Sequence, residues 1–149
     1  MSDPQTELGE LTIRRTFAAR PEVVFECMTT PAHLTHFWGP LGMSTPLDRI
    51  TVEPRPGGRF ETVMVNDETG DEYPVNGVFM EFDPPRTFSF TEAGVDGGMM
   101  TKIVFNDLGD GRTETVTHQT NVPPMLMSPE AQAGLETSFV KFDAYLASL

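Results

Sequence analysis

The sequence predicts an α+β fold in which a curved antiparallel sheet closes around one long C-terminal helix. Two observations support this fold class. The chain before the last helix consists mainly of short alternating segments separated by turns rich in glycine and proline. Strands joined in succession by short turns form an antiparallel meander. The end of the chain repeats large apolar side chains at the spacing of one helix face, at Leu135, Phe139, Phe142, Leu146 and Leu149.

The C-terminal helix is expected to begin at Pro129 and to continue to the end of the chain. Ser128 is a favourable N-cap, proline suits the first helical position, and Glu130 places a negative charge where the helix dipole favours it. A helix of this length extends over about 30 Å. Its apolar side is expected to face the sheet, so that helix and sheet together enclose the interior.

The remaining elements follow in a simple order. Residues 1–8 are expected to be a disordered tail, and residues 9–149 a single domain. One strand precedes two short helices at 21–28 and 31–37, each of which begins with a proline. The meander and the long helix complete a helix-grip architecture. The expected strands cover residues 10–18, 47–53, 59–66, 73–82, 87–92, 99–106 and 112–121.

The composition disfavours several classes of function. The chain carries 22 acidic and 10 basic residues, and a net charge of −12 repels nucleic acids and anionic lipid surfaces. No apolar run is long enough to span a membrane, and the N-terminus lacks the features of a signal peptide, so we expect a cytoplasmic protein without membrane insertion. The single cysteine, Cys27, excludes an internal disulfide and lies in an apolar stretch that predicts an inert buried thiol.

Several short motifs occur in an order that is typical of one superfamily. They lie at residues 15–17, 21–25, 31–40, 55–60, 77–82 with 84–85, 88–91, 117–118 and 139–146. In this order they resemble the START-like (SRPBCC) superfamily, and within it the group named after the activator of heat-shock-protein-90 ATPase. The resemblance covers nearly the whole chain. It implies a helix-grip fold with a cavity between the sheet and the last helix, which binds apolar small molecules in the superfamily and performs cyclisation or hydrolysis in some branches.

The chain departs from this group at two aromatic positions. It has Phe37-Trp38 where the group usually has two tryptophans, and Gly134-Leu135 where the group usually has glycine followed by tryptophan. The second change leaves a smaller side chain facing the sheet. The shape of the cavity therefore cannot be carried over from the resemblance.

The candidate ligand-binding residues are the ones whose strand or helix position suggests an inward side chain. The pattern leaves open whether Phe60 and Met64 or Val63 and Val65 face inward on one strand. It also leaves open whether these residues form a solid core or the wall of a pocket, and whether Trp38 is a lid or a plug. The candidates are Trp38, Phe60, Met64, Phe79, Glu81, Phe88, Phe90, Ile103, Val116, His118, Leu135 and Phe139.

The most promising polar pair is Glu81 with His118. His118 shares strand parity with Val116, which predicts an inward position, and Glu81 shares parity with Phe79. A histidine beside a carboxylate in an apolar space could act as acid and base, or could orient a ligand. A purely structural role for the histidine is the alternative. His33 and His36 lack a third ligand, so neither a metal nor another cofactor is expected.

The first functional hypothesis is therefore a non-enzymatic domain that holds a hydrophobic small molecule between sheet and helix. An enzyme of the cyclase, hydratase or hydrolase kind with His118 as acid–base is the second. The third is an interaction module, either a chaperone partner or a homodimer, which would carry a contiguous apolar patch on its outside.

Overall fold

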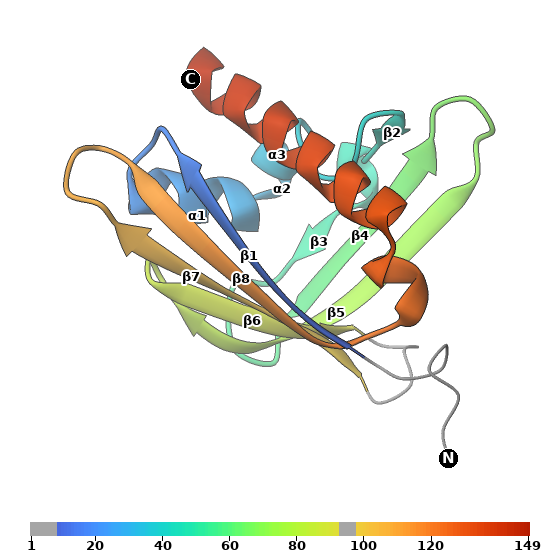
Figure 1. The fold of residues 1–149 in the computed structure, drawn as a ribbon, viewed down its shortest axis with the longest axis horizontal. Helices are drawn as coiled ribbons and strands as arrows, with labels where there is room; N and C mark the ends of the chain where they lie inside the picture. Colours follow the sequence, from blue (N-terminus) through green and yellow to red (C-terminus); the bar gives the residue numbers. More distant parts are fainter. Residues whose placement is uncertain (1–8, 93–97) are drawn as a thin grey trace.

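The computed structural model describes residues 9–92 and 98–149 of the chain. An eight-stranded antiparallel sheet curves around the helix α3, and α1 and α2 lie on the same side of the sheet as α3 (Figure 1). The strand order is β1-β8-β7-β6-β5-β4-β2, and β3 also pairs with β4. The helix-grip α+β fold is therefore confirmed. The disordered tail expected at residues 1–8 lies outside the described residues.

The elements follow the expected order with two local differences. Only two residues of the strand expected at 47–53 are extended, because Pro46 starts a tight turn in which the Arg49 N–H donates to its carbonyl. The second helix ends at Leu34, and further turns lead to Phe37. The bounds are β1 Gly9–Phe17, α1 Pro21–Thr29, α2 Pro31–Leu34, β2 Met43–Ser44, η2 Leu47–Arg49, β3 Thr51–Val52, β4 Arg59–Asn66, β5 Glu72–Asp83, β6 Thr87–Glu92, β7 Met99–Asp107, β8 Thr113–Val122, η3 Pro124–Met127 and α3 Pro129–Ser148.

Helix α3 begins as the sequence predicts. The Ser128 hydroxyl accepts a hydrogen bond from the Ala131 N–H at 3.1 Å, and Pro129 occupies the first helical position. Phe142 and Leu146 of the apolar stripe are buried. Leu149 is 64% exposed, so its expected place on the inner stripe is wrong, because α3 ends at Ser148 and the last residue extends beyond the packed part of the helix. No helix among the described residues is long and apolar enough to cross a membrane.

A cluster of phenylalanine rings fills one half of the space inside the sheet. Phe25 of α1 contacts Phe82, Phe88 and Phe105 with ring centroids between 5.1 and 5.5 Å apart. Phe60 joins the same core and is fully buried. This settles the open choice on β4, where Phe60 and not its neighbours in sequence points to the centre of the core.

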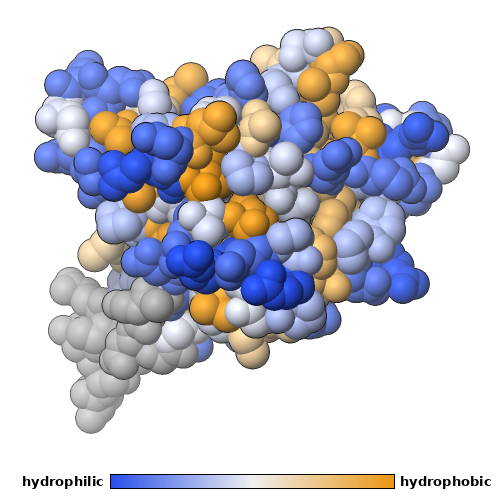
Figure 2. Space-filling view, turned by 180° about the vertical axis from the view of Figure 1, so that it is seen from behind, coloured by the Kyte–Doolittle hydropathy of each residue, from blue (hydrophilic) through white to orange (hydrophobic). Residues whose placement is uncertain are grey.

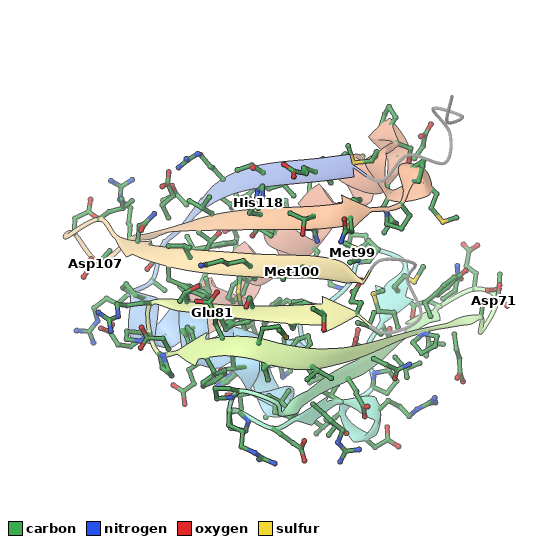
Figure 3. The ribbon with its side chains drawn as sticks, turned by 90° about the horizontal axis from the view of Figure 1, so that it is seen from below. Asp71, Glu81, Met99, Met100, Asp107 and His118 are labelled. Atoms are coloured by element: carbon green, nitrogen blue, oxygen red, sulfur yellow. The ribbon has the colours of Figure 1, made fainter. Side chains whose placement is uncertain are left out.

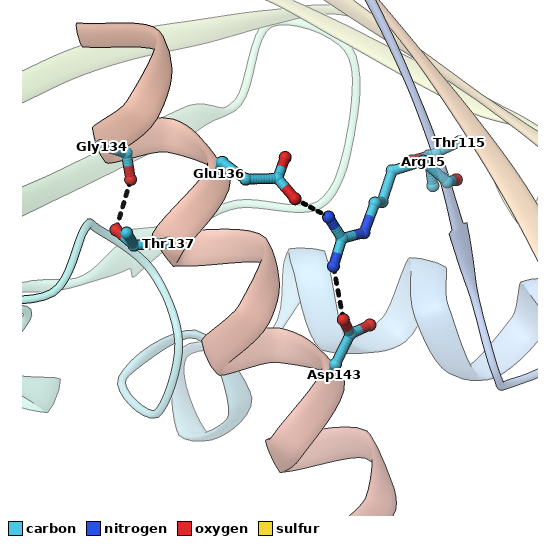
Figure 4. Close-up of polar contacts among 6 residues, drawn as sticks. All are labelled: Arg15, Thr115, Gly134, Glu136, Thr137 and Asp143. Atoms are coloured by element: carbon cyan, nitrogen blue, oxygen red, sulfur yellow. Dashed lines mark hydrogen bonds and ion pairs between the residues drawn. The ribbon is translucent and has the colours of Figure 1, made fainter. Parts of the chain in front are cut away.

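In the C-terminal half of α3, Phe142 packs against this core. Phe142 stacks on Phe37 at 4.0 Å and contacts Phe17 at 4.8 Å. Arg15 of β1 adds a polar attachment, since its guanidinium donates to Glu136 and, at 2.5 Å, to Asp143 (Figure 4). Burial alone lowers the pKa of Arg15, but the two carboxylates outweigh this effect and raise it above the usual value.

Phe142→Ala should lower the free energy of unfolding by about 3–5 kcal/mol, because it removes a ring enclosed between two others and leaves a cavity. Urea unfolding followed by circular dichroism measures the change. The matched control is Val140→Ala on the outer side of α3, where the side chain is 53% exposed and the change should stay within about 0.5 kcal/mol. Equal losses in both variants would contradict the role of Phe142.

Candidate functional site

The other half of the interior is hollow. A cavity of about 460 Å³ lies between the N-terminal half of α3, the segment at residues 37–40 and the inner face of the sheet. Phe90 and Ile103 form part of its floor, Leu135 and Phe139 belong to the helix above, and Trp38 closes one side. Its volume falls within the range of pockets that bind small molecules, which is about 300–1,000 Å³.

Small side chains on the helix and on the sheet leave room for the cavity. On α3, Ala131, Gly134 and Ser138 face the space, and Thr101 and Thr117 face it from the sheet. None of these side chains is long enough to reach the opposite wall. The helix therefore remains separated from the strands where the phenylalanine cluster ends.

The segment beside α3 is tied to the helix by three side chains. Ser138 donates to the Phe37 carbonyl at 3.0 Å, and the Thr137 hydroxyl accepts from the Leu41 N–H at 3.0 Å. The Lys141 ammonium donates to the Gly39 carbonyl at 3.0 Å. Burial lowers the pKa of Lys141, although the charge of Asp67 acts in the opposite direction. These bonds fix one wall of the cavity in place.

Polar side chains also line the sheet side of the cavity. The Gln119 amide donates to the Thr101 hydroxyl at 3.3 Å, and Glu92 is the last residue of β6 on the same inner face. Within the described part of the chain, the Glu92 carboxylate forms no hydrogen bond or ion pair. Burial raises its pKa above the usual value of 4.5, because an apolar environment disfavours the charged form.

Comparison with models of known protein families identifies the family of the chain. Residues 18–147 match the family described as Activator of Hsp90 ATPase homolog 1-like protein. The chain belongs to this family. The match confirms the START-like resemblance and covers most of the sequence. None of the curated proteins compared with the chain matches it.

Solved structures of similar proteins share the fold over almost their whole length. A protein from Rhodobacter sphaeroides is 24% identical with a TM-score of 0.83, covering 96% of this chain and 99% of its own. A protein from Nitrosomonas europaea is 23% identical with a TM-score of 0.80, and the match covers 99% of this chain and 98% of the other. The AHSA1 protein from Silicibacter pomeroyi is 26% identical with a TM-score of 0.75, and the match covers 93% of this chain and 98% of the other.

The structure divides the sequence-predicted site residues into three groups. Three are enclosed in the solid phenylalanine core and do not line the cavity, namely Phe60, Phe79 and Phe88. Three have their side chains on the outer side of the sheet, namely Glu81, Val116 and His118. The residues that line the cavity are Trp38, Met64, Phe90, Ile103, Leu135 and Phe139.

The expected inward pair of Glu81 and His118 is wrong. His118 is exposed on β8, where its Nδ1 lies 2.9 Å from the Thr12 hydroxyl, and Glu81 of β5 forms an ion pair with Lys102 at 3.2 Å. Strands β6 and β7 separate the two residues, which Figure 3 shows on the outer face. The inner positions of β8 are occupied by threonines instead, and Thr115 is fully buried among them. Val116 therefore faces outward as well.

A β-bulge explains the position of Glu81. The pairing of β5 with β6 shifts between Phe79 and Glu81. An extra residue in a strand reverses the alternation of its side chains. Phe79 and Phe82 consequently both reach the core, where their rings lie 5.1 Å apart, and Glu81 faces outward.

His33 of α2 and His36 in the turns after it both contact Tyr145 of α3. His33 Nδ1 lies 2.5 Å from the Tyr145 hydroxyl, and His36 stacks on the same ring at 4.7 Å. The described residues contain no group of three or more possible ligands arranged around a metal ion. Cys27 is buried as predicted; burial, followed by the charge of Glu26, raises its pKa to about 11. At this pKa the thiolate is scarce at neutral pH.

Glu92, Gln119 and Thr117 line the cavity but were not predicted from the sequence. Glu92 lies two residues beyond Phe90, so strand parity alone would have placed it on the inner face. Gln119 and Thr117 were missed because the opposite parity was assigned to β8. Threonine and valine both favour strands, so residue type could not correct that assignment.

Glu92→Gln should increase the free energy of unfolding at neutral pH. The raised pKa means that the folded state holds the proton more tightly than the unfolded state. The resulting stabilisation is present below the usual pKa and is lost as the pH rises through the folded pKa. The difference in unfolding free energy between the variant and the wild-type protein should therefore shrink toward zero at about pH 4.

Urea unfolding of both proteins at the two pH values measures this effect. Glu68→Gln provides the control, since it removes the same charge from an exposed turn between β4 and β5. A Glu92→Gln variant that is less stable than the wild-type protein at neutral pH would contradict the interpretation.

Proposed function

We propose that the protein binds a hydrophobic small molecule in the cavity between α3 and the sheet. The observation that carries this proposal is the volume of about 460 Å³ enclosed mainly by apolar side chains. A fold of this family is a ligand-binding type of module in general, which supports the proposal without identifying the ligand.

The driving force would be the removal of apolar ligand surface from water. This contributes about 25 cal/mol per Å² before the cost of ordering the ligand is subtracted. The walls reduce that cost because they are already held in place. Trp38 packs edge-to-face on Phe60 at 5.5 Å, and the bonds from Ser138 and Lys141 fix the segment beside it.

The two other hypotheses have less support. His118 lies outside the cavity, so an acid–base role there has no apolar substrate site beside it. An interaction module would need a contiguous apolar patch. On the face drawn in Figure 2, hydrophobic residues form separate patches between hydrophilic ones. Binding to a chaperone and formation of a homodimer stay predictions.

Leu135→Trp should weaken binding of a neutral apolar dye such as Nile red by at least about tenfold, because the larger ring occupies the cavity. Fluorescence titration measures the dissociation constant. Native mass spectrometry of the purified protein tests in parallel for a co-purified ligand.

The matched control is Val78→Trp, which adds the same ring on the exposed outer face of β5. It should leave the affinity for the dye unchanged. Urea unfolding verifies that both variants are folded. Equal dye affinity in the wild-type protein and the folded Leu135→Trp variant would contradict binding in this cavity.

A further inference from the structure

The charged groups that line the cavity all have the same sign. Glu92 lies on the inner face at the end of β6, and Glu130 lies at the rim in the first turn of α3. Among the described residues of the lining, none is basic. The Lys141 ammonium is directed to the Gly39 carbonyl, 3.0 Å away, and does not line the space.

Glu92 is the acid with the stronger reason to bind a ligand. Glu130 is exposed to water, whereas Glu92 is partly buried and has no partner in the described part of the chain. A desolvated carboxylate without a partner is costly, and a cation beside it removes most of that cost. Such a cation would have to come from outside the lining.

The neighbouring groups suit a cation that carries an apolar body. Gln119 lies on the same inner face, and its amide oxygen can accept a hydrogen bond while its N–H donates to Thr101. The aromatic rings of Trp38 and Phe90 line the same space, and ring faces attract cations. An anionic amphiphile such as a fatty acid would meet the negative charge of Glu92 and no basic side chain among the described residues of the lining.

We propose that the cavity selects hydrophobic amines, with the ammonium group bound by the Glu92 carboxylate and the apolar body held under α3. This assignment rests on the proposed binding function and names its ligand class. The overall charge of −12 supports it, since the field of the protein attracts cations and repels anions.

Isothermal titration calorimetry at neutral pH with decylamine, decanol and decanoate tests the proposal. The three probes share one alkyl chain and differ in the charge of the head group. We expect decylamine to bind at least about tenfold more tightly than decanol, because only the ammonium group forms an ion pair with the Glu92 carboxylate. Decanoate should bind more weakly than decanol.

Glu92→Gln should reduce the ratio of the decanol and decylamine dissociation constants from at least about ten to about one. Glu68→Gln, which removes an equal charge from the exposed turn, should retain the wild-type ratio. A ratio that falls equally in both variants would overturn the assignment to Glu92, and so would a ratio that survives in Glu92→Gln.

The test separates this proposal from the one on which it rests. Equal binding of decylamine and decanol to the wild-type protein would overturn the selection of amines but leave a hydrophobic site in place. Binding of none of the three probes, together with no binding of Nile red, would overturn both.

Discussion

The structure depends on how α3 is attached to the rest of the domain. Phe142 is enclosed between Phe17 and Phe37, and Arg15 joins the helix to β1 through Glu136 and Asp143. The ring contacts act on the C-terminal half of the helix. The N-terminal half of the helix is held by polar contacts, from Glu136 to Arg15 of β1 and from Thr137 and Ser138 to the segment beside the helix.

The hollow space lies beside the N-terminal half of α3. Where α1 inserts Phe25 among the sheet phenylalanines, the interior is close-packed in the way that protein cores normally are. Under the N-terminal half of α3, the small residues Ala131, Gly134 and Ser138 face the space. The hydrogen bonds from Ser138 and Lys141 keep the adjoining segment from collapsing inward. One half of the interior is thus close-packed, and the other half is hollow.

The polar lining of the cavity gives this space its chemical character. An apolar pocket alone would accept any hydrophobic molecule of suitable size, since the hydrophobic effect is not directional. Glu92 and Gln119 add directional groups on the inner face of the sheet, and only one of them carries a charge. Specificity would therefore arise at β6 and β8, whereas most of the affinity would arise from the aromatic and aliphatic walls.

The fold class and the long helix could be predicted because they depend on local patterns. The stripe that contains Phe142 and Leu146, the cap at Ser128 and the glycine and proline turns are properties of neighbouring residues. Strand faces were harder to predict. The bulge after Phe79 reverses the alternation of β5, and the threonines of β8 resemble their valine neighbour in strand preference, so Glu81 and His118 were assigned to the wrong side.

By itself, the sequence determined the order of the elements, the amphipathic helix and the acidic character of the chain, because each is encoded in composition or short-range spacing. Only the tertiary structure decided which half of the interior is full, and that Glu92 and not His118 faces the empty half. Both outcomes depend on strand register and on the distance between α3 and the sheet, which are set by contacts between residues far apart in the chain.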